Sequence, residues 1–176
     1  MMKPWRRWML KYRAISGEED HKQCLKLRYQ VFVEEQGVEP DLEITDEKDS
    51  IHFLAERDGS VIGTGRFRIH GNLLKFERVA VLKAMRGQGV GKGLLEFMQK
   101  KGFNTYPEYL MFMHAQTHAQ LFYEKLGWRP VGEPFDEDNI EHIAMVLTPT
   151  DVTQLKAYHD PQTPDLLKKF LIARKS

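Results

Sequence analysis

Three glycines at alternate positions, Gly87, Gly89 and Gly91, follow Arg86 within the stretch Lys75 to Leu95, KFERVAVLKAMRGQGVGKGLL. Glycine lets a backbone pass close to a ligand, and the first amides of a helix carry the positive end of the helix dipole. The apolar pattern around the glycines predicts a buried strand, a polar turn and then a helix. The stretch therefore predicts an anion-binding loop whose chemistry suits phosphate groups.

Two common phosphate motifs do not fit this loop. A Walker loop needs glycine where Arg86 stands and Ser or Thr where Gly93 stands. The dinucleotide fingerprint needs a third glycine at the position of Lys92. Neither a P-loop nor a Rossmann site is expected.

The sequence R-G-Q-G-V-G from Arg86 to Gly91 resembles the signature R/Q-x-x-G-x-G/A of the GNAT superfamily of acetyl-CoA-dependent N-acetyltransferases. Downstream, A-x-x-F-Y-E-K-L-G-W (Ala119 to Trp128) is similar to the later helix of that superfamily. Upstream, L-R-Y-Q-V-F-V-E-E-Q-G (Leu27 to Gly37) resembles the first helix of the ElaA- or YjcF-like subgroup, as does His114-Ala115-Gln116. These segments lie within residues 8 to 148.

The resemblance implies acetyl-CoA as co-substrate, with the pantetheine beside the strand that precedes the loop and the pyrophosphate on the loop amides. Gln116 stands where many members have Asn, and its amide offers the same donor and acceptor on a longer arm. Lys92 and Lys125 could approach the other phosphate or could be solvated surface lysines. No metal is expected, since His114 and His118 do not share a helix face. The expected cofactor contacts are Val79, Ala80, Val81, Arg86, Gly87, Gln88, Gly89, Val90, Gly91, Lys92, Gln116 and Phe122.

Tyr123 is the expected general acid. A phenol of pKa near ~10 can protonate a thiolate whose conjugate acid has a pKa near ~8.5. The resemblance supports this role, because the Phe122-Tyr123 pair lies where the superfamily places its acid. The alternative is a tyrosine packed in the core beside Phe122 and Leu126.

Glu77 is the expected general base, because it shares a strand face with Val79 and Val81 and could take a proton from the substrate ammonium. The subgroup often lacks a carboxylate at this place. The alternative is a salt bridge to one of three arginines, Arg66, Arg68 or Arg78.

Nothing in the sequence names the acetyl acceptor. By analogy, the segment Arg28 to Gln36 and the acidic loop after it line the acceptor side, where the carboxylates would favour a cationic amine. These carboxylates are Glu34, Glu35, Asp41 and Glu43. A solvated acidic loop is the alternative. His114 and Glu35 are further candidate bases. The expected acceptor-side residues are Arg28, Phe32, Glu35, Gln36 and His114.

Periodicity supplies the elements that position these residues. A Ser16/Glu19 capping box predicts the start of the first helix, and Thr163-Pro164-Asp165 predicts the start of the last. Turn signals at Asp58-Gly59 and Gly71-Asn72 separate three antiparallel strands. The expected strands are Trp8–Ile15, Ile51–Glu56, Val61–His70, Leu73–Val81, Tyr109–His114, Trp128–Gly132 and Ile140–Leu147.

The expected fold class is α/β (α+β). The resemblance implies the GNAT fold, with a mixed, mostly antiparallel sheet of six to seven strands, about four flanking helices, and a V-shaped splay between the fourth and fifth strands. A strand-helix-strand crossover makes that central pair parallel. The expected domains are residues 1–149 for acetyl transfer and 150–176 as a helical extension that packs on the domain or on a partner, so a homodimer stays open.

Composition limits the alternatives. The 176 residues carry 26 basic and 25 acidic side chains, so no global field recruits nucleic acid or an anionic membrane. No window approaches the ~20 apolar residues of a membrane helix, and the single cysteine, Cys24, excludes an intrachain disulfide, so we expect a cytoplasmic protein. The basic run KPWRRWMLKYR, with Trp5 and Trp8, leaves nucleic-acid binding as a minor alternative.

The sequence thus predicts an enzyme that transfers acetyl from acetyl-CoA to a primary amine of a small molecule, by direct attack in a ternary complex. Two alternatives stay open. One is a catalytically silent acyl-CoA-binding regulatory module, and the other is a protein or peptide N-acetyltransferase.

Overall fold

The computed structural model of the protein describes residues 9–175, so Trp8 and the basic run before it lie outside the described residues. The chain forms two compact units. Unit 1 comprises the chain up to Thr45, Ile51–Arg66 and Arg78–Phe97, and unit 2 comprises Asp46–Ser50, Phe67–Glu77 and the chain from Met98 onward.

Seven strands form a mixed sheet in the order β1-β2-β3-β4-β5-β7-β6, in which β4 and β5 are parallel, as predicted. The fold is α/β. The strands are β1 (Leu10–Ala14), β2 (Ile51–Arg57), β3 (Ser60–His70), β4 (Leu73–Val81), β5 (Leu110–Gln116), β6 (Arg129–Glu137) and β7 (Ile140–Leu147).

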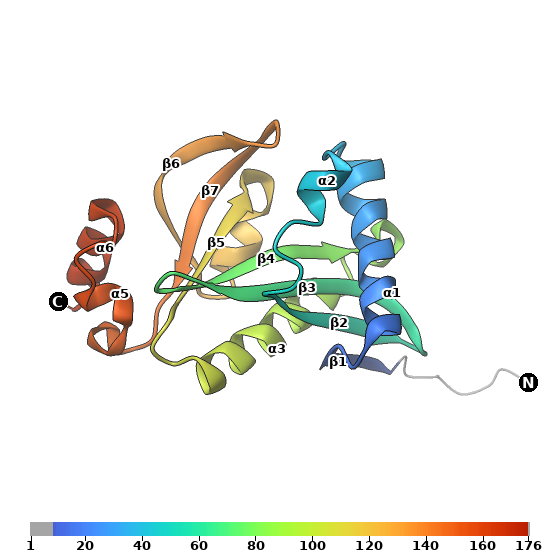
Figure 1. Cartoon of the computed structure of the whole chain (residues 1–176), viewed down its shortest axis with the longest axis horizontal. Coiled ribbons are helices and arrows are strands. Elements are labelled where there is room, and N and C mark those ends of the chain that lie inside the picture. The colour runs from blue at the N-terminus through green and yellow to red at the C-terminus, as the bar shows by residue number, and fades with distance from the viewer. Residues whose placement is uncertain (1–8, 176) are drawn as a thin grey trace, which may run out of the picture. The chain divides into compact units, whose positions relative to one another are not determined.

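Six α-helices occur within residues 9–175, and two of them, α2 and α5, have only four residues each. These two short helices account for the excess over the four expected. The six are α1 (Glu18–Arg28), α2 (Pro40–Glu43), α3 (Val90–Thr105), α4 (Gln120–Glu124), α5 (Lys156–His159) and α6 (Asp165–Lys175). Figure 1 labels α1, α2, α3, α5 and α6.

In unit 1, β1 pairs antiparallel with β2, and α1 contacts β2 (Figure 1). The predicted capping box is wrong, because Gly17 is the N-cap residue and has no side chain to offer. The backbone N–H and the hydroxyl of Ser16 instead donate to the carboxylate of Asp20. Asp20 also accepts from Arg13, and this ion pair fixes the start of the helix.

After α1 the chain continues as a π-helical segment, Tyr29–Glu35, and Gly37, which has φ 75°, follows its C-cap residue Gln36. The sequence predicted an uninterrupted helix here. A π-helix inserts extra residues per turn and often occurs at functional sites. Val31 and Phe32 of this segment are buried in one apolar cluster with Leu27 and Ala80.

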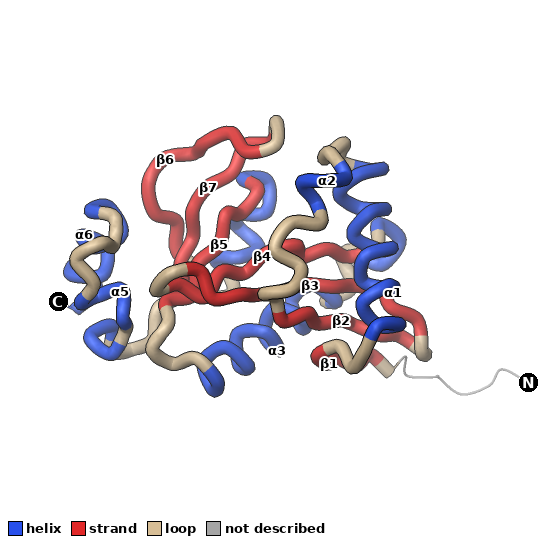
Figure 2. Tube along the Cα trace, viewed as in Figure 1, coloured by secondary structure: helices blue, strands red, loops and turns tan. Residues whose placement is uncertain are grey.

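In unit 2, β5 and β6 both pair antiparallel with β7, and β4 pairs with β5 over Leu73–Phe76 and Leu110–Met113. The predicted splay beyond this pairing stays a prediction. We expected β6 to end at Gly132, but the strand continues to Glu137. Gly132 has φ 81° and lies within a register irregularity, so it forms a bulge rather than a strand end. Figure 2 shows the resulting long hairpin in red with a tan turn.

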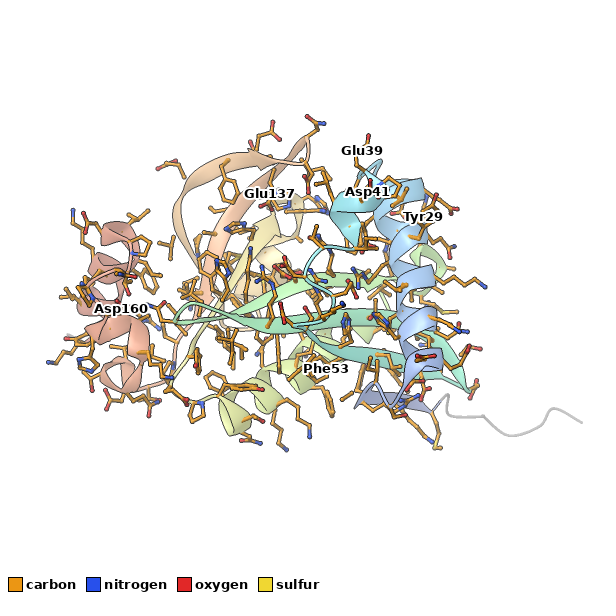
Figure 3. The ribbon with its side chains drawn as sticks, viewed as in Figure 1. Tyr29, Glu39, Asp41, Phe53, Glu137 and Asp160 are labelled. Atoms are coloured by element: carbon orange, nitrogen blue, oxygen red, sulfur yellow. The ribbon has the colours of Figure 1, made fainter. Side chains whose placement is uncertain are left out.

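Residues after Thr150 contribute to the core of unit 2. Asp160, labelled in Figure 3, and Thr163 both accept hydrogen bonds from the Asn72 amide, at 2.7 and 3.0 Å. The extension therefore packs on strands of its own chain, while its boundary as a separate domain stays a prediction. One buried cluster joins strands and extension: Leu110, Val131, Val146, Val152, Leu155, Ala157, Leu167 and Leu171.

Within residues 9–175, no helix combines the length and hydropathy that a membrane crossing requires.

Candidate active site

The glycine loop of unit 1 has the backbone that the sequence predicts. Gly87 and Gly89 have φ values of 72° and 80°, which side chains of L-residues rarely adopt. A Cβ atom at either position would meet nothing within 4 Å, so open space lies beside the loop backbone. The Gly89 carbonyl accepts from Gly93 N at 3.1 Å and starts the hydrogen bonding of α3. The loop therefore offers helix-start amides next to room for a ligand.

Arg86 connects three parts of unit 1. Its Nε donates to the Val81 carbonyl at 3.0 Å, and its two terminal nitrogens donate to the Glu35 carboxylate at 2.6 and 3.0 Å. The hydrogen bonds from Arg86 lower the pKa of Glu35 below its ordinary value. The structure thus pairs Arg86, a predicted phosphate-binding residue, with Glu35, a predicted acceptor-side residue.

The side chain of Gln88 ties the loop to its surroundings through two hydrogen bonds. Its amide nitrogen donates to the Ala84 carbonyl at 3.1 Å, and its amide oxygen accepts from Arg57 at 2.8 Å. Arg57, at the end of β2, was missed, because no local pattern links it to the loop. Val90 is buried, Gly91 is half-buried and Lys92 is exposed on the first turn of α3. In the strand before the loop, Ala80 is buried and Val79 and Val81 are half-buried.

Two predicted acceptor-side residues lie in the interior of unit 1. Phe32 belongs to the buried cluster with Leu27 and Val31. Arg28 is 1% exposed and donates to Glu43 Oε1 at 2.5 Å, and Glu43 is 2% exposed. Gln36 is half-buried where the π-helical segment ends. The acidic loop is therefore not wholly solvated, since Glu43 belongs to an internal ion pair.

Arg78 adds a second cation to this buried pair. It donates to the Leu42 and Glu43 carbonyls at 2.8 and 3.0 Å and thereby holds α2. Its φ of 55° lies in the left-handed region, which costs a non-glycine residue free energy. The contacts of Arg78 therefore maintain a strained backbone within β4, directly before Val79–Val81.

In unit 2, Tyr123 is half-buried on α4, with its ring 5.1 Å from Phe122 and 6.5 Å from Trp128. Burial raises the pKa of Tyr123 to about 12. The phenol keeps its proton throughout the neutral range but releases it less readily than a solvated tyrosine. Phe122 is 37% exposed, so part of its ring remains available to a ligand.

Glu77 lies in an ion-pair cluster of unit 2. Arg68 donates to both of its carboxylate oxygens at 3.2 Å, and Lys75 Nζ lies 3.4 Å from Oε1. Arg68 also pairs with Asp46 at 3.3 Å. The structure thus contains the Glu77–Arg68 salt bridge that was the alternative to a catalytic role, and Lys75 is a second cation paired with the Glu77 carboxylate.

His114 lies beside two groups that sequence analysis did not select. Its Nδ1 is 3.1 Å from Glu137 Oε1, and His142 Nε2 is 3.8 Å from Glu137 Oε2. Glu137 is labelled in Figure 3 on the β6–β7 hairpin. Gln116, a predicted cofactor contact, is half-buried and pairs in register with His142. Glu137 was missed because β6 was expected to end before it.

The mixed sheet with its parallel β4–β5 pair, and the glycine loop between β4 and α3, are the arrangement that the resemblance to acetyltransferases implies. The family described as Acetyltransferase (GNAT) domain matches residues 18–149, and the chain belongs to this family. It is a transferase of the N-acetyltransferase type.

Curated relatives support the predicted subgroup. Uncharacterized protein YyaT of Bacillus subtilis is 39% identical over 142 residues, which are 76% of this chain and 92% of YyaT. The uncharacterized N-acetyltransferase YjcF of the same organism is 34% identical over 132 residues, 74% of this chain and 94% of YjcF.

Solved structures share the fold. The crystal structure of Escherichia coli ElaA matches with a TM-score of 0.72 and 27% identity over 79% of this chain and 99% of ElaA. A GNAT family acetyltransferase from Elizabethkingia anophelis with acetyl-CoA bound matches with a TM-score of 0.56 and 19% identity, over 78% of this chain and 94% of that one.

Proposed function

We propose that this protein transfers the acetyl group of acetyl-CoA to a primary amine of a small molecule by direct attack in a ternary complex. The observation that carries the proposal is the loop Arg86–Gly91. Its left-handed glycines leave open space beside the backbone at the start of α3, in a chain of the GNAT acetyltransferase family.

The residues of the loop fit a pyrophosphate. Helix-start amides supply donors without an intrahelical acceptor, and a side chain at Gly87 or Gly89 would fill the adjoining space. The Elizabethkingia acetyltransferase of the same fold holds acetyl-CoA. We therefore assign the pyrophosphate to the loop Arg86–Gly91 and the pantetheine to the backbone of Val79–Val81.

Backbone and side-chain groups of the protein would then assist the acetyl transfer. A backbone N–H of Val79–Val81 would donate to the thioester oxygen, and such a preorganised donor contributes about 3 kcal/mol in the transition state. Tyr123 would protonate the departing thiolate. Its pKa of about 12 keeps the phenol protonated at neutral pH. Because a thiol is more acidic than this phenol, the transfer of the proton to the thiolate is uphill in free energy.

The test is calorimetric titration with acetyl-CoA, CoA and ATP, followed by a thiol-release screen across polyamines, amino sugars, amino acids and peptides. Acetyl-CoA binding and CoA release with a small amine are the expected results. Binding without release from any amine would favour a regulatory module, and release only with peptides would favour a protein N-acetyltransferase. Absence of acetyl-CoA binding would overturn the assignment of the loop.

A further inference from the structure

One face of the sheet in unit 2 is divided into an apolar and a polar half. In the register of β5 with β7, His114 lies opposite Ala144 and Gln116 lies opposite His142. Phe135 of β6 lies opposite His142, and Glu137 is two residues further along the strand. Because side chains alternate along a strand, these groups share a face with Leu110. The Leu110 end of this face lies in the core with α6, and the His114 end carries the polar groups.

The hydrogen bonds within the polar half fix the imidazole of His114. An ionised carboxylate can only accept, so Nδ1 of His114 carries the hydrogen that it donates to Glu137 at 3.1 Å. The neutral ring then has its lone pair on Nε2. Phe112 and Phe135 flank the ring at centroid distances of 5.3 and 4.8 Å. The side chain of His114 is 27% exposed, so a solute can reach it.

Glu137 is suited to hold a positive charge on His114. The hydrogen bond from His114 is the largest cause that lowers the pKa of Glu137, and His142 and Lys75 add to it. His142 donates from Nδ1 to the Ile140 carbonyl at 2.7 Å, which leaves its Nε2 on the side of Glu137. The carboxylate therefore stays ionised when an adjacent imidazole takes up a proton.

Acetyl transfer to an amine requires a base of this kind. An alkyl ammonium with a pKa near ~10.4 is almost wholly protonated at neutral pH and cannot attack a thioester. Imidazole is the side chain that ordinarily changes charge between about pH 5 and 8. Glu77, the base expected from the sequence, has Arg68 at 3.2 Å and Lys75 at 3.4 Å on its carboxylate.

We propose that His114 is the general base for the acceptor amine and that Glu137 positions it and stabilises its protonated form. This inference rests on the proposed acetyltransferase function. Nε2 takes one proton from the substrate ammonium and passes it to water. The amine nitrogen then bonds to the acetyl carbon, the carbon–sulfur bond breaks, and the nitrogen loses a second proton. The thiolate gains one proton, so each turnover releases one proton to solvent.

The experiment compares His114→Ala, Glu137→Gln and the control Glu133→Gln, which changes an exposed carboxylate on the same strand. Each protein is first titrated with acetyl-CoA and then assayed with an amine that the wild-type protein acetylates. We expect an acetyl-CoA Kd within about twofold of wild type in all three, since the base does not hold the cofactor. We expect kcat to fall roughly 10²- to 10⁴-fold in His114→Ala and at least about tenfold in Glu137→Gln. Glu133→Gln should match wild type.

Two readouts separate chemistry from structure. Added imidazole should restore part of the activity of His114→Ala and leave wild type unchanged. The rise of kcat/KM with increasing pH should vanish in His114→Ala and should shift along the pH axis in Glu137→Gln. Glu137 faces His114, and His142 and Lys75 act in turn on Glu137. Wild-type kcat in His114→Ala would overturn the inference. So would a loss of kcat in both variants that imidazole does not rescue and that leaves the pH profile of kcat/KM unchanged. Either outcome would leave the proposed acetyltransferase function standing. A wild-type protein that acetylates no amine would overturn the proposed function itself.

Discussion

Arg86 and Glu35 form a two-pronged ion pair across 51 residues of sequence, with N–O distances of 2.6 and 3.0 Å. The guanidinium that stands at the head of the glycine loop is therefore already held by a carboxylate. A phosphate that binds this loop must share Arg86 with Glu35 or displace it.

Substitutions at this pair should change the affinity for acetyl-CoA in opposite directions. Arg86→Ala should raise its Kd about tenfold through loss of a charge-assisted contact. Glu35→Gln should lower the Kd about threefold, because a neutral amide holds the guanidinium less strongly. Calorimetric titration measures both, with Glu34→Gln as the exposed neighbouring control. An unchanged Kd in Arg86→Ala would remove Arg86 from the phosphate site.

Tyr123→Phe deletes one hydroxyl, and we expect kcat to fall about 10²-fold with the acetyl-CoA Kd unchanged. Since burial raises the pKa of Tyr123 to about 12, wild-type kcat should show no decline from this group up to about pH 10. Above pH 10 the unfolded chain ionises this tyrosine first, so its burial lowers stability as pH rises. Tyr29→Phe, on a side chain that is 47% exposed, is the control. Equal kcat in Tyr123→Phe and wild type would leave Tyr123 a packing residue.

Arg78 allows backbone strain and side-chain anchoring to be separated. Arg78→Ala loses the hydrogen bonds to Leu42 and Glu43 and keeps a Cβ at φ 55°. Arg78→Gly loses the same bonds but has no steric cost in this conformation. We expect Ala to be the less stable of the two by about 1 kcal/mol in denaturant unfolding. If the two variants unfold together, the left-handed conformation stores no strain.

Leu171 and Ile172 are neighbours on α6 with opposite environments, 0% and 54% exposed. Leu171→Ala should lower the free energy of unfolding by about 2–5 kcal/mol, because it opens a cavity among strands and extension. Ile172→Ala should cost less than about 0.5 kcal/mol. Denaturant titration of both tests whether α6 is part of the core, and similar losses would mean that it is not.

Asp20 should make unfolding sensitive to acid. Its hydrogen bond from Arg13 is the largest cause that lowers its pKa, followed by that from Ser16 N. A depressed folded-state pKa stabilises the protein above the unfolded value of about 3.9, and this stability is lost as pH falls through the folded value. Asp20→Asn should therefore lose about 1 kcal/mol at neutral pH, and this loss should shrink progressively as pH falls below about 4. Glu18→Gln is the control, and a pH-independent loss would exclude the linkage.

Local turn chemistry made much of the fold predictable. Asp58 and Gly59 have φ values of 50° and 83°, as a tight hairpin requires, and the strands on either side were expected. Gly132 was misinterpreted because a glycine with positive φ can end a strand or bulge within it, and only pairing with β7 decides between them. The position of Glu137 depended on that choice.

The loop of the candidate site was predictable because glycine is itself the signal. Its partners were not, since they come from distant parts of the chain. No spacing connects Arg57 to Gln88, 31 residues apart. Likewise, the burial of Arg28 depends on Glu43, a member of a stretch that appears fully solvated from composition alone.

The division of the β5 face has an electrostatic consequence. Leu110 is fully buried under the extension, while His114, four residues along the same face, is partly exposed. Hydrocarbon of low dielectric constant on one side weakens screening, so we expect the hydrogen bond between His114 and Glu137 to be stronger than it would be on an open surface. The extension lies outside residues 18–149, which match the family, and we expect it to strengthen this interaction through the buried cluster that it helps to form.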